Sequence, residues 1–165
     1  MTEAEPLWER RRVEEVGISI EVYLPWPYET RIEADRGNIY QEIADTGGFV
    51  FLQYGEVARL ESFVTMQSDF VTEVSILDEV QLDYCGQQAR RMTLRSVRQS
   101  LGVYRQDPID GLTHGLSPGG RRIICVIGFG SRNTPVLFGY ELPEEKLPLY
   151  QPVLERILNS AKALL

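Results

Sequence analysis

The chain has 165 residues, which is the length of one average domain and short for two. Hydrophobic residues make up 43% of it and charged residues 25%, a composition typical of a globular protein and unlike that of a disordered one. Asp and Glu number 24 against 17 Lys and Arg, so the net charge is −7. An acidic domain repels phosphate backbones, which makes nucleic acid a poor partner.

The sequence shows neither a membrane span nor a secretory leader. No apolar run approaches the roughly 18 residues that a membrane helix needs, and the first residues lack a basic region followed by an apolar one. Cys85 and Cys125 are 40 positions apart without a second pair, which fits neither a disulfide scaffold nor a zinc site. We therefore expect a reduced, cytoplasmic protein that does not insert into a membrane, although a chain whose leader had been removed would look the same.

The first half of the chain contains two clear strand patterns. Residues 1–15 are rich in charge and are expected to be a lead-in to a single domain at 16–165. Residues 18–24 alternate apolar with polar side chains, as a strand does, until Pro25 and Pro27 end the pattern. Residues 29–46 are ambiguous, because their isoleucine spacing suggests a helix that Gly37 and Asn38 interrupt. The short apolar run 49–52 then predicts a buried strand.

A helix and a hairpin are predicted next. Residues 56–71 place apolar side chains, among them Leu60, Phe63 and Val64, at helical spacing. Residues 74–84 and 92–94 then suggest two antiparallel strands around a turn at 86–88. On one face this register sets Leu82 opposite Met92 and Val80 opposite Leu94. On the other face it sets Asp83 opposite Arg91 and Glu79 opposite Arg95. The spacing of the apolar residues and the pairing of opposite charges therefore favour the same register.

The second half begins with a long connection at 99–120, which is rich in glycine and has little periodicity. The continuous apolar run 123–127 predicts a central strand covered on both faces, and 136–140 predicts another strand. From Tyr150 to Leu165 the apolar residues form one helical stripe, with Pro148 and Pro152 at or before the first turn. These elements predict an α+β fold, an α/β/α sandwich with a mainly antiparallel central sheet and a C-terminal helix packed on it.

This order of elements resembles the PsbP-like superfamily, which includes the photosystem II protein PsbP and a Ran-binding import factor. The resemblance covers residues 16–165 and rests on three stretches: Leu24-Pro25-Trp26, the hairpin from Val80 to Arg91 with Gly86 at its turn, and the span from Val136 to Ala161 that contains Ile157-Leu158-Asn159-Ser160. It implies the same sandwich and a role in binding or assembly. Many bacterial relatives carry an export signal, which is not visible here. No partner-binding residue of the family can be matched to a position in this chain.

The motifs that suggest chemistry also have structural explanations. Gly128-Phe129-Gly130 lacks the third glycine and the following helix of a dinucleotide site, and therefore predicts a hairpin connection. Asp107, Asp110 and His114 are metal-ligand types but are also typical of turns. Cys125 is expected in the core, and only one histidine could activate Cys85. The runs at 10–12 and 121–122 are interpreted as solvated arginines, with anion binding as the alternative.

We therefore expect a non-enzymatic binding or adaptor domain with a protein partner, and no catalytic, cofactor or metal site. The aromatic residues Trp26 and Tyr28 at a proline break, together with the long connection, suggest a binding surface made of Trp26, Tyr28, Tyr104, Arg105 and His114. In the alternative interpretation, Trp26 only fills the core. The rival function is a small-ligand protein or an enzyme with a pocket under the 99–120 loop, lined by Arg105, Asp107, Asp110 and His114.

Overall fold

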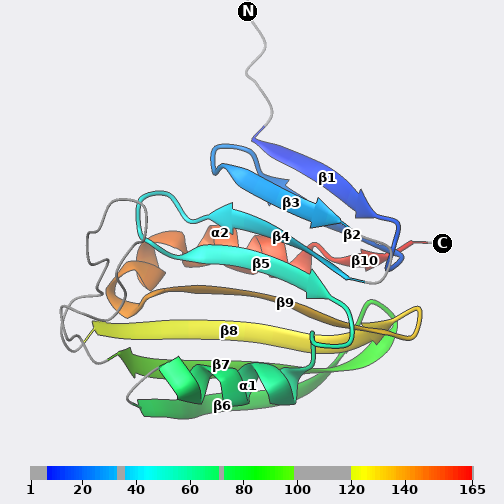
Figure 1. Ribbon diagram of the computed structural model, residues 1–165. Coiled ribbons are helices and arrows are strands. Elements are labelled where there is room, and N and C mark those ends of the chain that lie inside the picture. The colour runs from blue at the N-terminus through cyan, green and yellow to red at the C-terminus, as the bar shows by residue number, and fades with distance from the viewer. Residues whose placement is uncertain (1–6, 33–35, 71–72, 99–119, 165) are drawn as a thin grey trace, which may run out of the picture.

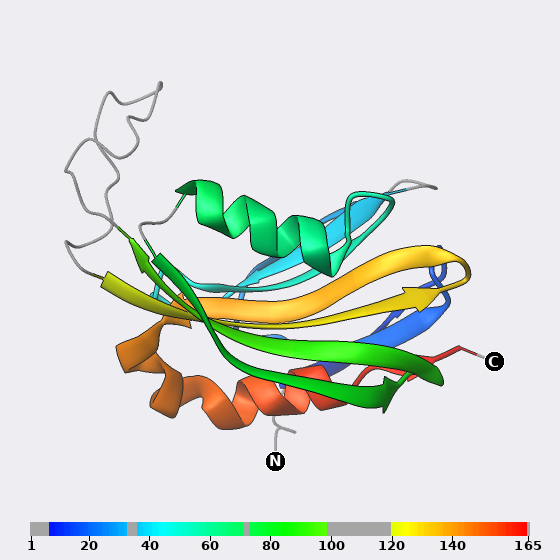
Figure 2. The same cartoon turned by 90° about the horizontal axis from the view of Figure 1, so that it is seen from below.

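The computed structural model describes residues 7–32, 36–70, 73–98 and 120–164, and its centre is a seven-stranded antiparallel sheet (Figure 1). In order across the sheet, the strands are β3 (Tyr28–Ile32), β4 (Gly37–Glu42), β5 (Phe49–Tyr54), β9 (Thr134–Pro143), β8 (Gly120–Ser131), β7 (Gln87–Arg98) and β6 (Glu73–Tyr84). Helix α1 (Leu60–Phe70) covers one face and α2 (Leu147–Asn159) the other (Figure 2). The 3-10 helix η1 (Glu144–Lys146) leads into α2.

A second, three-stranded sheet lies beside α2 and contains β1 (Trp8–Val13), β2 (Ile18–Tyr23) and β10 (Lys162–Ala163). The predicted lead-in at 1–15 thus includes a strand, since β1 pairs with β2 along its whole length. Arginines occupy three of the six positions of β1, so its sequence lacks a clear alternation of apolar and polar residues. Together the layers confirm the predicted α+β fold with a mainly antiparallel sheet and a packed C-terminal helix.

Two hydrophobic cores lie on the two faces of the large sheet, and β8 contributes to both. Ile124 and Val126 belong to the core under α1, whereas Ile123, Cys125 and Ile127 belong to the core under α2 and β2. This confirms the central strand predicted from the apolar run 123–127. Within the part of the chain that is described, no helix is long and apolar enough to span a bilayer.

The ambiguous segment 29–46 contains two strands, β3 and β4, rather than a helix. Ile39 and Gln41 face the core at a spacing of two, and the Gln41 amide donates to the carbonyl oxygens of Tyr23 (2.6 Å) and Trp26 (3.1 Å). Gly37 fits where a Cβ would lie 2.6 Å from the Tyr54 hydroxyl and from a backbone oxygen, so close approach explains this glycine. Gly37 and Asn38 therefore begin a strand instead of interrupting a helix.

The hairpin of β6 and β7 has a different register from the predicted one. Its turn is Cys85–Gly86, with φ of 53° and 74°, and not residues 86–88. Leu82 lies opposite Ala89, and Val80 lies opposite Arg91, so Leu82 and Met92 are on opposite faces of the sheet. The predicted pairs were therefore wrong. A bulge between Ile76 and Asp78 also shifts the alternation of side chains along β6. Even-numbered residues therefore lie on one face before the bulge and on the other face after it, and the spacing of the apolar residues is misleading.

The arginines of β7 have partners other than the predicted ones. Arg91 binds Glu155 of α2 at 2.7 Å, and Arg95 binds Glu144 of η1 at 2.5 Å. Arg90, on the other face, pairs with Glu79 and with Glu61 of α1. These ion pairs connect β7 to helices on both sides of the sheet. The predicted hairpin after Gly128-Phe129-Gly130 is confirmed, with its turn at Arg132–Asn133.

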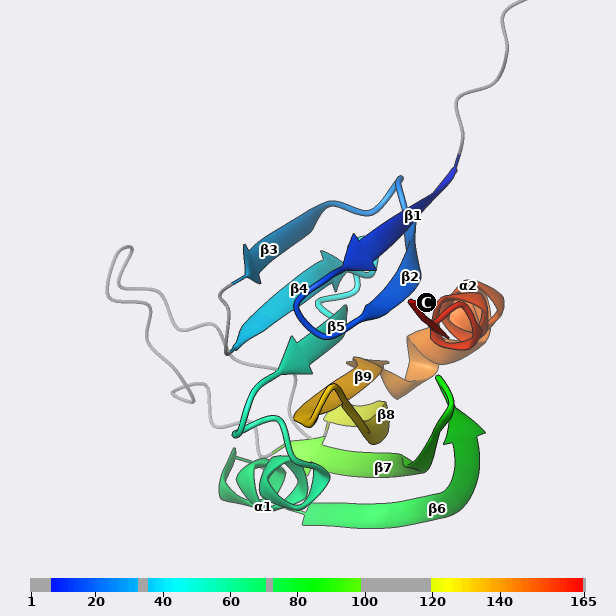
Figure 3. The ribbon, with the colours of Figure 1, turned by 90° about the vertical axis from the view of Figure 1, so that its right-hand side faces the viewer.

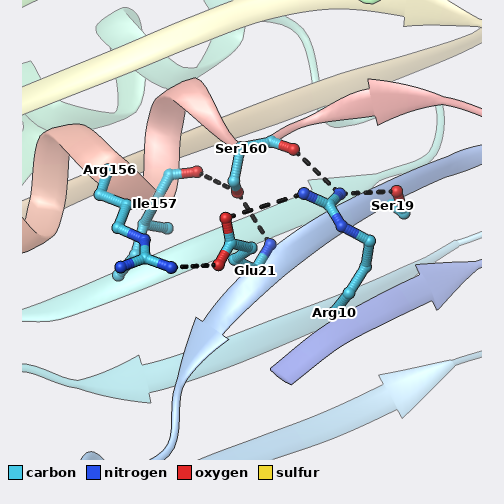
Figure 4. A network of polar contacts seen from close by, with 6 residues as sticks. All are labelled: Arg10, Ser19, Glu21, Arg156, Ile157 and Ser160. Atoms are coloured by element: carbon cyan, nitrogen blue, oxygen red, sulfur yellow. Dashed lines mark hydrogen bonds and ion pairs between the residues drawn. The ribbon is translucent and has the colours of Figure 1, made fainter. Parts of the chain in front are cut away.

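Polar contacts fasten the small sheet to the end of α2 (Figure 4). The Glu21 backbone N–H donates to Oγ of Ser160 at 2.8 Å, and that hydroxyl donates to the Ile157 carbonyl at 2.5 Å. Arg10 donates to the Ser160 carbonyl at 3.0 Å, while the Glu21 carboxylate binds Arg156 at 2.9 Å. The groups in this cluster satisfy one another, and the cluster therefore has a structural role.

Ser160→Ala is expected to destabilise the protein by about 1–3 kcal/mol, because it leaves the Glu21 N–H without this acceptor. Ser160 is buried, whereas Ser62 on α1 is exposed and serves as the matched control. Ser62→Ala is expected to change stability by no more than about 0.5 kcal/mol. Urea unfolding of both variants measures the difference, and equal effects would contradict the role given to Ser160.

Candidate partner-binding surface

The five residues predicted to form a binding surface are only partly described. Trp26 is 5% exposed and lies in the core, where its ring packs on Tyr23 (5.0 Å between centroids) and Tyr150 (5.9 Å). It therefore fills the core, as the alternative interpretation held. Tyr28 is 37% exposed, with the Arg11 guanidinium 5.5 Å from its ring centroid. Tyr104, Arg105 and His114 lie outside the described residues, as do Asp107 and Asp110.

The sheet also separates Tyr28 from the ends of the 99–119 segment. Tyr28 begins β3 at one edge, whereas that segment starts after Arg98 of β7 and ends before Gly120 of β8, two residues that pair with each other. Five interstrand steps separate β3 from β7, a distance of about 24 Å across the sheet.

The largest group of exposed apolar side chains on one described strand lies on β6. Ile76 is 55% exposed, Leu77 45% and Val80 44%. Figure 3 shows β6 as the outermost strand, at the opposite end of the sheet from β3. We call these three residues and the neighbouring acids Glu73, Asp78 and Asp83 the β6 edge.

The apolar side chains of the β6 edge lie on both faces of the sheet. Ile76 pairs with Leu94, which faces the core under α1. Val80 pairs with Arg91, whose guanidinium contacts α2 on the other face. Leu77 lies between them at the bulge. The apolar surface therefore wraps around the edge of the sheet.

The carboxylates of the β6 edge have few partners. β6 carries Glu73, Asp78, Glu79 and Asp83 and no lysine or arginine. Glu79 binds Arg90, but no ion pair engages the other three within the described ranges. Natural edge strands use charges and bulges to prevent their own association, and β6 has both. Three exposed apolar side chains on the same strand are more than that protective function needs.

Sequence reasoning missed this surface because strand order is not readable locally. The predicted register placed Val80 opposite Leu94 on the apolar face of the hairpin, whereas in the structure Val80 lies opposite Arg91, on the other face from Leu94, and is exposed at the edge. The sequence did contain one signal. A strand with one buried face carries its charged residues on the opposite face, at alternate positions, whereas the acids of 73–83 occupy both odd and even positions.

The buried polar residues near α2 do not form a nucleophilic site. Cys125 is buried beside Arg91, and burial raises the pKa of its thiol above the usual value. Burial also raises the pKa of the half-buried Cys85 thiol to about 11. Both thiols are unpaired, as predicted, and burial raises the pKa of each, whereas a catalytic cysteine needs a lowered pKa.

In the native protein, iodoacetamide is expected to label Cys85 slowly at pH 8 and faster as the pH rises toward 11, because only the thiolate reacts. Cys125 is expected to resist labelling at every pH at which the protein stays folded. In urea both cysteines should react with the ordinary thiol pKa of about 8.5. Mass spectrometry of timed samples distinguishes the two positions, and rapid native labelling of Cys125 would contradict its burial.

Two open grooves flank the start of α1. The first, of about 310 Å³, is lined by residues that include Arg59, Glu61, Arg90 and Phe129. Its arginines are already engaged, Arg59 with Glu56 at 2.8 Å and Arg90 with Glu61 at 3.1 Å. The second, of about 360 Å³, lies beside Arg31, Asn38 and Gln53. Because the arginines of the first groove are engaged in ion pairs, the β6 edge is the stronger candidate.

Comparison with solved structures identifies the architecture. No protein-family model matches the chain, and no curated protein matches it in sequence. The solution structure of cyanobacterial PsbP (CyanoP) from Synechocystis aligns with a TM-score of 0.56 and 10% identity, over 94% of this chain and 92% of that one. The chain has a PsbP-like fold.

The PsbP-like fold also includes a protein that binds another protein. The Ran-binding protein Mog1p of Saccharomyces cerevisiae aligns with a TM-score of 0.54 and 11% identity, over 95% of both chains. This likeness confirms the resemblance found in the sequence. At such low identity it establishes the fold alone.

Proposed function

We propose that this protein is a non-enzymatic binding or adaptor domain that binds a protein partner through the β6 edge. The observation that carries the proposal is the exposure of Ile76, Leu77 and Val80 on a twelve-residue strand at the end of the sheet. Exposed apolar groups in a cluster are typical of interaction sites, and a free sheet edge offers backbone groups as well. The Ran-binding function of Mog1p supports a protein as the partner class.

The surface suggested by sequence remains a second proposal, now reduced to Tyr28 with Tyr104, Arg105 and His114. The ligand-pocket alternative rests on residues outside the described ranges, so no observation favours it over the β6 edge. A reduced, cytoplasmic setting belongs to the proposal, because both thiols are unpaired.

A photo-crosslinking amino acid at position 80 tests the proposal. The full chain carrying p-benzoylphenylalanine in place of Val80 is irradiated in its native cells and its adducts are identified. Leu149 is the control position, because it is more exposed than Val80, at 70%, and lies on α2. We expect a protein adduct at position 80 that is missing at 149. The same adducts at both positions, or none at position 80, would contradict the proposal, and a third probe at Tyr28 tests the second surface.

A further inference from the structure

We infer that the β6 edge binds an extended, basic segment of its partner, which adds to the sheet as an eighth strand beside β6. The inference rests on the proposed function and specifies how the partner is recognised. Backbone groups, apolar side chains and charge each lead to it separately.

The backbone of β6 offers a regular set of hydrogen-bonding groups on its outer side. The turn Cys85–Gly86 has two residues, and the pair that flanks such a turn, Tyr84 and Gln87, is a hydrogen-bonded one. Bonded and non-bonded pairs alternate along an antiparallel ladder. Asp83, Gln81 and Glu79 are then the residues that direct their N–H and C=O groups away from β7. An added strand would pair with these groups.

The apolar side chains favour an added strand over a helix docked on one face. Ile76 and Val80 lie on opposite faces of the sheet. The side chains of an extended segment alternate between the two faces, so such a segment can contact both residues at once. A helix packed on one face would contact Ile76 or Val80, but not both.

Charge selects the composition of the segment. β6 carries four carboxylates and no cation, and only Glu79 has an ion-pair partner among the described residues. Pairing of β6 with β6 of a second copy would bring eight carboxylates together, which disfavours a homodimer at this edge. Lysine or arginine side chains on the incoming strand would instead lie beside Glu73, Asp78 and Asp83. A basic segment is therefore the complementary occupant.

Synthetic peptides test the inference on the full, unmodified chain. The probe is a fluorescent ten-residue peptide in which pairs of lysines alternate with pairs of valines, so that an extended strand presents both residue types on both faces. Its counterpart replaces each lysine by glutamate. We expect the basic peptide to bind by fluorescence anisotropy, with affinity that falls as salt increases, and the acidic one to bind at least about tenfold more weakly. Equal binding of the two peptides would overturn the charge argument.

N-methylation of the basic peptide separates strand addition from contact through side chains. Two versions are made, each methylated on one of the two alternate sets of backbone amides. An added strand directs one set toward β6 and the other toward solvent, so one version should lose binding and the other should keep it. If both versions bind like the parent, the peptide does not add as a strand and the inference is wrong.

Variants of the protein locate the binding to the β6 edge. The triple variant Glu73→Gln, Asp78→Asn, Asp83→Asn is expected to weaken peptide binding about tenfold. Its control, Glu9→Gln, Glu29→Gln, Glu42→Gln, neutralises three exposed acids on other strands and should leave binding unchanged. Gln81→Pro removes one outward N–H and should reduce binding, whereas Gln81→Ala should not. Equal effects within either pair would overturn the location.

The peptide experiment and the crosslinking experiment test different claims, so that a negative result in one does not imply a negative result in the other. A partner captured at position 80 without any binding of the basic peptide would keep the proposed function and overturn strand addition. Loss of both results would overturn both. Protection of the Gln81 and Glu79 amides from hydrogen exchange on peptide binding is the expected confirming signal.

Discussion

Deletion of residues 151–165 is expected to leave a chain that does not unfold cooperatively. Leu154, Ile157 and Leu158 are completely buried against the sheet and β2, and the deletion also removes Ser160 and β10. Burial of each large apolar side chain stabilises a protein by about 1.5–3 kcal/mol. The loss for these three alone, about 5–9 kcal/mol, is comparable to the whole stability of a domain, about 5–15 kcal/mol. A soluble 1–150 fragment with a cooperative thermal transition would contradict this expectation.

A matched pair of point variants tests the same element without deleting it. Leu158→Ala removes a fully buried side chain and is expected to cost about 2–5 kcal/mol. Leu149→Ala removes the same atoms from an exposed position of the same helix and is expected to cost no more than about 0.5 kcal/mol. Denaturant unfolding measures both.

The second large effect is expected at a buried ion pair that the sequence did not reveal. Arg122 is 4% exposed, and its Nε lies 2.7 Å from Oε1 of Glu141, while an Nη nitrogen donates to the Gly47 carbonyl at 3.2 Å. The interpretation of this arginine as solvated charge is therefore wrong. Arg122→Met removes the cation that binds the buried Glu141 carboxylate at 2.7 Å and is expected to destabilise the protein by about 3–5 kcal/mol.

The double variant Arg122→Met, Glu141→Leu separates the cost of losing one partner of the ion pair from the contribution of the ion pair itself. Well-packed apolar residues can replace a buried ion pair with little loss, so the double variant is expected to be more stable than Arg122→Met alone. Arg12→Met is the surface control, because Arg12 and Glu14 form a pair that is 62% exposed on both sides. A double variant less stable than the single one would contradict this account.

The strands that were predicted correctly carry their information locally. The alternation at 18–24 and the apolar runs at 49–52, 123–127 and 136–140 each report burial on one or both faces. Strands whose burial depends on elements distant in the sequence were missed or assigned the wrong register. β1 is one, since Arg10 binds Ser19 of β2 and the Ser160 carbonyl after α2, and Arg12 binds Glu14.

The register of the β6–β7 hairpin shows a second limit. A bulge changes the parity of every residue on one side of it, and nothing in the sequence around Leu77 marks one. Arg91 and Arg95, the two β7 cations that the predicted register paired, bind acids that lie at least 49 positions away, on α2 and η1, so the charge pattern could not correct the error.

The binding surface depended on long-range order in the same way. That β6 is an edge strand follows from the position of all six other strands, which no local pattern contains. Trp26 shows the same limit, because an aromatic residue between two prolines is compatible both with an exposed loop and with a buried side chain in the core. Only the packing of Tyr23 and Tyr150 around it decides between them.

The central position of β2 in the small sheet has a consequence for biosynthesis. β2 pairs on one side with β1 and on the other with β10. The small sheet therefore cannot be completed at residues 18–19 until residues 162–163 have been synthesised. β5 likewise pairs with β9, more than eighty positions later. A ribosome makes about 5–20 residues per second, and the early strands therefore spend seconds without their partners. Chaperones that bind nascent chains are expected to meet the apolar residues of β2 and β5 during that interval.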